Sequence, residues 1–167
     1  MNGEAPPSST RLDRAAAIVL CAGVIAVMLA ALSFKVFELD RYFVPKELVM
    51  NIAAFSSAMI LIARGTHERP DIVDALLIVF LLWSMVSGIF ATNHWLAQRA
   101  IAVSLSSAVV FWTARNTAQG GLQRPLLVAA ATATVIAAAT SLTQAYGVES
   151  EWFTLARAPG GTLGNRN

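Results

Sequence analysis

The chain has 167 residues, of which 56% are hydrophobic and only 13% are charged, with a mean hydropathy of +0.61. A soluble domain carries roughly 25% charged residues because its surface faces water, so this composition excludes an ordinary water-soluble fold and indicates a membrane protein. The formal net charge is only +2, and the basic residues are scattered over several loops, which excludes a nucleic-acid-binding footprint.

The N-terminal part of the chain predicts a polar tail followed by a membrane span. Residues 1–14 contain few apolar side chains and the run Pro6-Pro7-Ser8, a composition typical of a disordered tail. Residues 15–34 carry no charge and are long enough to cross roughly 30 Å of hydrocarbon as a helix. The alternative is a cleaved signal peptide, whose apolar region is usually about 7–15 residues long. We therefore expect a retained span.

Two further apolar runs follow, at residues 47–63 and 72–90. Pro45 lies just before the first of them, where its missing N–H suits an opening helical turn. Asp71 and Asp74 lie at the start of the second, where carboxylates favour the positive end of the helix dipole. Both runs are therefore predicted to be transmembrane helices.

The fourth and fifth predicted spans are residues 96–114 and 125–146, with Gly120 and Gly121 in the turn between them. Small residues recur at every fourth position of the fifth span: Ala129, Ala133 and Ala137. Such spacing lets helices approach closely in lipid, which would make this helix central in the bundle. The alternative is an alanine-rich composition with no packing role.

These segments predict an all-α fold, a polytopic transmembrane bundle of about five spans. With the N-terminus inside, the loops place Lys and Arg almost evenly: Arg11, Arg14, Arg64, Arg69, Arg115 and Arg124 inside, and Lys35, Arg41, Lys46, Arg157 and Arg166 outside. The uncharged turn at residues 91–94 and the arginines before the first span favour a cytoplasmic N-terminus. Residues 147–167 would then form an outer-face loop.

Arg99 is the most informative single residue, because a guanidinium one turn inside a span is costly. One interpretation is an anion site, since arginine offers a planar fork of donors to phosphate. The other is a side chain that snorkels to the nearby membrane surface beside Trp95.

The final loop has a second candidate anion site. Gly161, Gly164 and Asn165 follow Arg157 closely, and such residues permit left-handed backbone and close approach to a ligand. Backbone N–H groups beside an arginine can bind anions. The alternative is an ordinary glycine-rich turn. The loop lacks the Gly-Lys-Ser/Thr ending of a nucleotide-binding P-loop.

No complete catalytic set can be assembled from this chain. His67 and His94 lie in separate loops, and Cys21 is the only cysteine, so no metal-ligand spacing is present. We therefore expect neither a metal nor another cofactor, and the catalytic residues stay unassigned.

Several segments resemble the O-antigen ligase and polymerase family of membrane proteins. Residues 157–167, RAPGGTLGNRN, are similar to a family loop of the form R-x-x-G-T-(F/L)-G-N-P-N, with Arg166 where the family usually has proline. Supporting similarity comes from Pro45-Lys46-Glu47, from Trp83-Ser84, from the turn at residues 91–100 and from Gln144 to Gly147. Members of this family have about a dozen spans, so the resemblance implies that the chain is the front portion of a longer bundle, inactive alone.

The resemblance also implies a function. Family members transfer a glycan from an undecaprenyl-diphosphate carrier to an acceptor at the periplasmic face of the bacterial inner membrane, during assembly of lipopolysaccharide or another surface polysaccharide. The matching residues for the diphosphate would be Arg99, Arg157, Gly161, Gly164 and Asn165. Ligase and polymerase share this front half and are not separated by it. The alternatives from other classes are a small oligomeric transporter or channel subunit and a membrane scaffold without catalysis.

Overall fold

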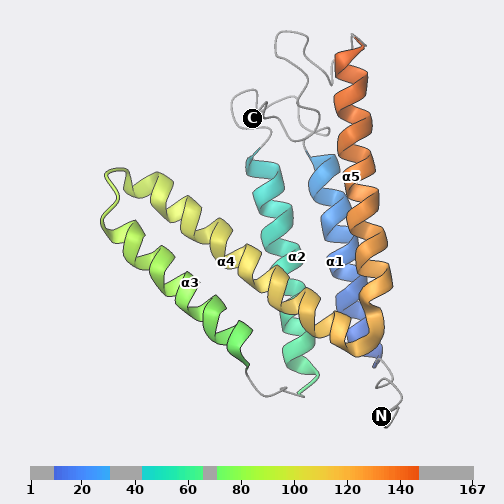
Figure 1. The fold of residues 1–167 in the computed structure, drawn as a ribbon, viewed down its shortest axis with the longest axis horizontal. Helices are drawn as coiled ribbons and strands as arrows, with labels where there is room; N and C mark the ends of the chain where they lie inside the picture. Colours follow the sequence, from blue (N-terminus) through green and yellow to red (C-terminus); the bar gives the residue numbers. More distant parts are fainter. Residues whose placement is uncertain (1–9, 31–42, 66–70, 147–167) are drawn as a thin grey trace.

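The computed structural model describes residues 10–30, 43–65 and 71–146, and in this part of the chain every regular element is a helix (Figure 1). The elements are α1 (Arg11–Ala30), α2 (Val44–Ala63), α3 (Ile72–Ile89), α4 (His94–Thr117), the π-helical turn η1 (Ala118–Leu122) and α5 (Gln123–Ala145). Four stretches are long and apolar enough to cross a membrane: α1, α2, α3 and the 50-residue run His94–Thr143. The expected all-α fold with membrane-type helices is confirmed at this level.

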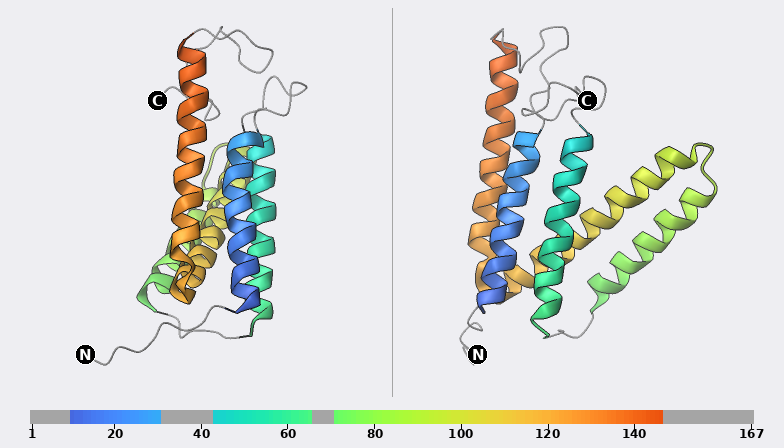
Figure 2. Two further views of the ribbon diagram at one scale, coloured as in Figure 1. Left: turned by 90° about the vertical axis from the view of Figure 1, so that its right-hand side faces the viewer. Right: turned by 180° about the vertical axis from the view of Figure 1, so that it is seen from behind.

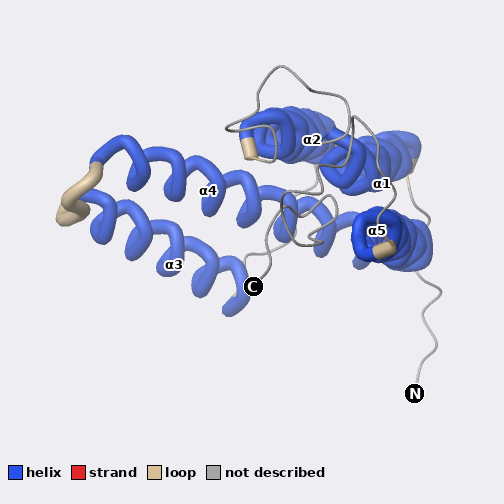
Figure 3. The backbone as a smooth tube through the Cα atoms, turned by 90° about the horizontal axis from the view of Figure 1, so that it is seen from above, coloured by secondary structure: helices blue, strands red, loops and turns tan. Residues whose placement is uncertain are grey.

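The helices are arranged as an upright group and a tilted hairpin. α1 lies between α2 and α5, and the α3–α4 hairpin leans away from these three (Figures 1 and 2). Seen from above, the hairpin extends to one side of the group (Figure 3). α3 packs on α4, and none of its residues is buried. Consecutive helices run in opposite directions, so the bundle has two ends, which we call the Arg99 end and the Arg64 end.

The central helix is α1, so the prediction that the alanine-rich helix would be central is wrong. Ala129 and Ala133 are buried where α5 meets α1, but Ala137 is only half-buried and most of the rest of α5 is exposed. The small-residue spacing of α5 therefore marks one packed face of that helix. The central position belongs to α1, because α1 alone contacts α2, α4 and α5.

Helices α1 and α2 pack closely against each other. A methyl group built on Gly23 would come within 2.4 Å of the Ala53 Cβ atom, so the two backbones meet where one residue has no side chain. Ala16, Ala17, Ala54 and Ala58 are buried in the same region. Small residues allow this approach, which in lipid supplies the packing that holds helices together.

α1 begins four residues before the predicted span. Thr10 and Asp13 form a capping box, in which the Asp13 carboxylate accepts from the Thr10 backbone N–H at 2.8 Å and the Thr10 hydroxyl accepts from the Asp13 N–H at 3.2 Å. Residues 11–14, assigned above to a disordered tail, are therefore helical. Residues 1–9 and 31–34 lie outside the described residues.

The other helix starts follow their caps. α2 begins at Val44 with Pro45 in its first turn, before the predicted start at residue 47. α3 begins at Ile72 as predicted, behind an Asp71–Asp74 capping box. α4 begins at His94, two residues earlier than predicted, because the Asn93 side chain accepts from the Leu96 N–H at 3.2 Å.

The predicted turn between the fourth and fifth spans is a helical kink and not an open loop. Gly121 adopts a φ of 85°, a left-handed conformation that glycine adopts without steric cost. The chain reverses direction there, so α5 runs back along α1 (Figure 2). The long apolar run from His94 to Thr143 is thereby divided into two arms.

Candidate functional site

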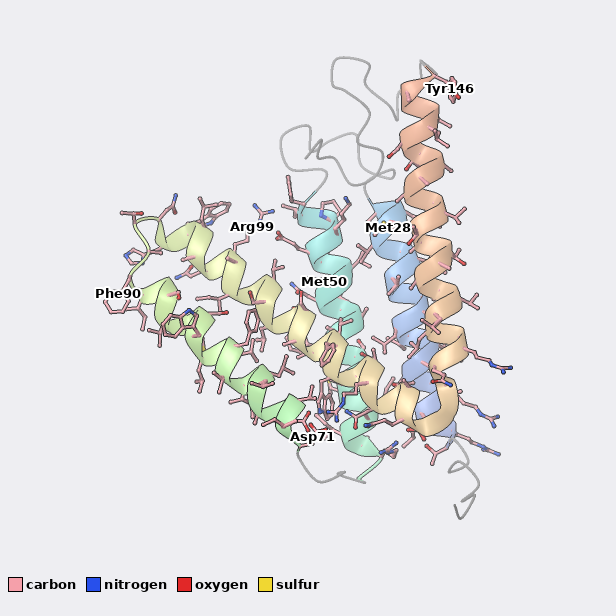
Figure 4. The ribbon with its side chains drawn as sticks, in the orientation of Figure 1. Met28, Met50, Asp71, Phe90, Arg99 and Tyr146 are labelled. Atoms are coloured by element: carbon pink, nitrogen blue, oxygen red, sulfur yellow. The ribbon has the colours of Figure 1, made fainter. Side chains whose placement is uncertain are left out.

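Arg99 forms the centre of a cluster at one end of the bundle. Its Nε atom lies 2.9 Å from both carboxylate oxygens of Glu47 on α2. The Arg99 and Glu47 side chains are 22% and 26% exposed, so neighbouring residues cover most of the surface of the pair. Figure 4 shows Arg99 near the start of α4, close to the beginning of α2. Glu47 on the neighbouring helix α2 therefore holds this guanidinium, a partner that neither interpretation of Arg99 included.

Two aromatic rings complete the cluster. The guanidinium carbon of Arg99 lies 5.9 Å from the ring centroid of Phe43 and 5.5 Å from that of Trp95. Both distances fall within the range of cation–π attraction, which strengthens as water is removed. Phe43 precedes α2 and Trp95 lies in the first turn of α4, so the helix starts themselves bring the rings to the arginine.

A polar contact continues the α2–α4 interface away from this cluster. The Ser106 hydroxyl donates to the Asn51 side-chain oxygen, and Ser106 is fully buried. Asn51 lies one turn after Glu47 on α2, and Ser106 lies two turns after Arg99 on α4. Hydrogen bonds between membrane helices stabilise a pair by roughly 0.6 kcal/mol on average, so these contacts fix the register of α2 on α4.

An apolar cavity of about 410 Å³ lies beyond the polar contacts, between α1, α2 and α4. Its walls are Leu20, Gly23, Val24, Val27 and Met28 of α1, Met50 and Ala53 of α2, and Ser107, Val110 and Phe111 of α4. Met28 and Met50 lie in the same half of the bundle as Arg99 (Figure 4). Ser107 is the only polar side chain in this lining.

The Arg99 end also contains the N-terminal ends of two helices. Both α2 and α4 begin there, so the positive ends of two helix dipoles lie near the cluster. Among the described residues of the first two turns of these helices, Lys46 and Arg99 are basic and Glu47 is acidic.

At the Arg64 end, ion pairs join neighbouring helices. Arg64 at the end of α2 binds Asp13 of α1 at 2.5 Å, and a methyl group on Gly120 would lie 3.8 Å from the Asp13 carboxyl carbon. Arg115 of α4 contacts both Asp71 and Asp74 at the start of α3, at 3.1 Å for Asp74. These pairs tie α1 to α2 and α3 to α4, and we assign them a structural role.

At the Arg64 end, the surroundings of Asp71 lower the pKa of its carboxyl group. Desolvation acts to raise the pKa of its carboxyl group. The backbone N–H groups of Asp74 and Val73 and the guanidinium of Arg115 act in the opposite direction and together hold this pKa below its ordinary value of 3.8.

The structure places only one of the predicted site residues. Arg99 lies in the cluster described above, whereas Arg157, Gly161, Gly164 and Asn165 lie outside the described residues, so nothing shows whether they approach Arg99. Sequence reasoning named Glu47 only as part of the Pro45-Lys46-Glu47 resemblance and gave Phe43 no role. The available signal was an opposite charge in the first turn of another span that begins at the same end of the bundle.

Within the described ranges, no group of three or more His, Cys, Asp or Glu side chains is arranged to hold a metal ion. Comparisons of this chain with protein-family models, with characterised proteins and with solved structures found no match.

Proposed function

We propose that this chain is the membrane-spanning front portion of an O-antigen ligase-like glycan transferase, and that its Arg99 end binds the diphosphate of an undecaprenyl-diphosphate-linked glycan. The observation that carries the proposal is the Arg99 cluster, in which Glu47 and two aromatic rings orient a guanidinium where two helices begin. Oriented donors in a poorly hydrated site bind phosphate more strongly than the same donors in water. The sequence resemblance supplies the identity of the lipid carrier.

The proposal includes five spans. The reversal at Gly121 supports this count, since α4 and α5 have 24 and 23 residues and each is long enough to cross the hydrocarbon layer separately. A straight helix of 50 residues would be about 75 Å long, far more than a bilayer of roughly 30 Å accommodates.

We also propose that the N-terminus is cytoplasmic and that the Arg99 end faces the periplasm. Of the cations in the described residues, Arg11, Arg14, Arg64, Arg115 and Arg124 belong to the Arg64 end. Only Lys46 and Arg99 belong to the Arg99 end of this described part. An excess of arginine favours the cytoplasmic side, and this arrangement puts the diphosphate site where the lipid-linked glycan is used.

The reaction requires stabilisation of a leaving group. An acceptor hydroxyl would bond to the anomeric carbon as the bond from that carbon to the diphosphate oxygen breaks, and the hydroxyl proton would be released. Negative charge then grows on the departing undecaprenyl diphosphate, and cations placed beside it lower the barrier. Arg99 would be one of them, and Arg157 in the glycine-rich loop would be the second.

Binding of undecaprenyl diphosphate to the purified chain in detergent, followed by native mass spectrometry, tests the proposal. Arg99→Gln should weaken this binding about tenfold, a loss of roughly 1.4 kcal/mol, whereas Arg124→Gln at the opposite end should leave it unchanged. Undecaprenol, which lacks the diphosphate, should bind equally to the unchanged protein and to Arg99→Gln. Equal diphosphate binding by the two arginine variants would remove Arg99 from the site.

A second candidate is a small oligomeric transporter or channel subunit, or a scaffold. The observation that favours it is α3, an 18-residue apolar helix without a buried residue. In an oligomer this helix would pack against a neighbouring subunit. A single-chain mass in detergent, measured by light scattering, would exclude an oligomeric transporter or channel subunit, and a defined oligomer disrupted by Val79→Arg on α3 would favour it over the transferase.

A further inference from the structure

The contact between Arg99 and Glu47 gives one N–H group two acceptors. Both carboxylate oxygens of Glu47 lie 2.9 Å from the Nε atom of Arg99. In the strongest arginine–carboxylate pairs, each oxygen instead accepts from an N–H group of its own. Phosphate oxygens accept from the same guanidinium donors. A bound diphosphate and the Glu47 carboxylate are therefore alternative acceptors for the Nε–H group of Arg99.

The pair joins α2 and α4 where these two helices are least packed. The helices cross at an angle, and α4 leads away from α2 toward the Arg99 end (Figures 1 and 3). The buried residues of α4, namely Ser106, Ala108, Thr113 and Thr117, all belong to the half of the helix nearer the Arg64 end. The first contact of this packed half is the hydrogen bond from Ser106 to Asn51. The ion pair therefore closes the less packed half of the junction.

Both partners keep favourable surroundings when the pair separates. Glu47 lies in the first turn of α2, where the positive end of the helix dipole favours a carboxylate, and its side chain is 26% exposed. Trp95 lies one turn before Arg99 on the same helix, so its ring stays beside the guanidinium wherever α4 moves. Separation therefore leaves Glu47 at a position that suits its charge, while Arg99 keeps its aromatic neighbour.

We propose that the Arg99–Glu47 pair is an ionic latch: the diphosphate displaces Glu47 from Arg99, and the start of α4 then moves relative to the start of α2. This inference rests on the proposed function, because it describes how the same site is regulated. Whatever opens the latch favours the diphosphate, and the diphosphate opens the latch to the same degree. In the unliganded protein, Glu47 is an internal competitor for Arg99.

The sign of one substitution tests the competition. The dissociation constant of undecaprenyl diphosphate is measured on the complete chain in detergent by native mass spectrometry. Glu47→Gln keeps the size of the side chain and removes its charge, and it should tighten binding about fivefold, the lower end of the range usual for coupled equilibria. Asp74→Asn removes a carboxylate at the Arg64 end and should leave the binding unchanged. Weaker or equal binding by Glu47→Gln overturns the latch, and weaker binding would make Glu47 a positioning residue.

The movement is measured by electron paramagnetic resonance between two spin labels. The labels are attached to Leu48→Cys on α2 and Leu96→Cys on α4, both exposed positions, in a Cys21→Ala background. Undecaprenyl diphosphate should shift the distance between the labels, and Glu47→Gln should produce the same shift without the lipid. An unchanged distance in Glu47→Gln overturns the latch even where binding is tighter, because the loss of one negative charge would then explain the affinity.

A second pair of labels shows that the variants remain folded. Ile62→Cys on α2 and Gln119→Cys on η1 are exposed positions at the Arg64 end, and their separation should stay constant. The latch and the proposed function fail separately. Weaker binding by Arg99→Gln with no distance change in Glu47→Gln keeps the diphosphate site and overturns the latch. Unchanged binding by Arg99→Gln overturns the proposed function and, with it, the diphosphate as the ligand that opens the latch.

Discussion

The Nε atom of Arg99 lies 2.9 Å from both carboxylate oxygens of Glu47, although the two residues are 52 positions apart in the sequence. The pair joins the tilted α3–α4 hairpin to the upright helices, because Arg99 belongs to α4 and Glu47 to α2. At the other end of the hairpin, Arg115 joins α4 to the start of α3. Ion pairs therefore act at both ends of α4, and packing of apolar side chains acts between them.

We predict that Arg99 and Glu47 are energetically coupled. Arg99→Gln and Glu47→Gln should each destabilise the protein, and the double variant should be less damaged than the sum of the two. A coupling of roughly 1 kcal/mol is expected, between the values for exposed and for buried pairs. The coupling is measured by thermal unfolding in detergent of the unchanged protein, the two single variants and the double variant. Strictly additive losses would show that the pair contributes nothing to the bundle.

We predict that Gly23→Ala disrupts the contact between α1 and α2. The added methyl group would meet the Ala53 Cβ atom at 2.4 Å, and neither atom can rotate away, so about 1–3 kcal/mol of stability should be lost. Gly88→Ala is the matched control, since its close neighbour at 2.5 Å is the rotatable end of Ile101. Thermal unfolding should separate the two variants, and equal midpoints would contradict the close α1–α2 approach.

We predict that the attachment of α3 to α4 weakens in acid. The pKa of Asp71 in the folded protein lies below 3.8, so its charge stabilises the fold above that pH, and the stabilisation is lost as the pH falls through the lowered pKa. Asp71→Asn keeps a residue that caps helices well but removes the charge. The unchanged protein should therefore be more stable than Asp71→Asn at pH 6, and the two should converge below pH 3.8. A difference that persists unchanged in acid would argue against the charge effect.

We predict that Gly121→Ala damages the reversal between α4 and α5. A non-glycine residue at a φ of 85° costs roughly 1–2 kcal/mol. Gly120→Ala is its neighbour and control, because a methyl group there meets the Asp13 carboxyl carbon at an ordinary 3.8 Å. Unfolding midpoints in detergent should fall for the first variant and stay nearly constant for the second. A lower midpoint for Gly120→Ala than for Gly121→Ala would contradict a chain reversal at Gly121.

The sequence predicts the helices well because their apolar runs and caps are local features. The start of α3 at Ile72 follows from Asp71 and Asp74. The Thr10–Asp13 capping box that begins α1 was missed, because residues 1–14 were predicted to be a disordered tail. The sequence does not predict that α1 is central, since which helix faces which depends on close contacts such as Gly23 on Ala53. Arg99 could be singled out by its cost in a membrane, but its partner Glu47 could not, because helix neighbours must be known first.

The most direct test of the membrane topology is the accessibility of single cysteines at the two ends of α5, in a Cys21→Ala background. A membrane-impermeant maleimide added to intact bacterial cells with a permeabilised outer membrane should label Tyr146→Cys but not Gln119→Cys, which should react only after the inner membrane is opened. This is the result expected if α5 crosses the membrane and the Arg99 end faces the periplasm. Equal labelling of both positions in intact cells would contradict the fifth span and, with it, the proposed placement of the site.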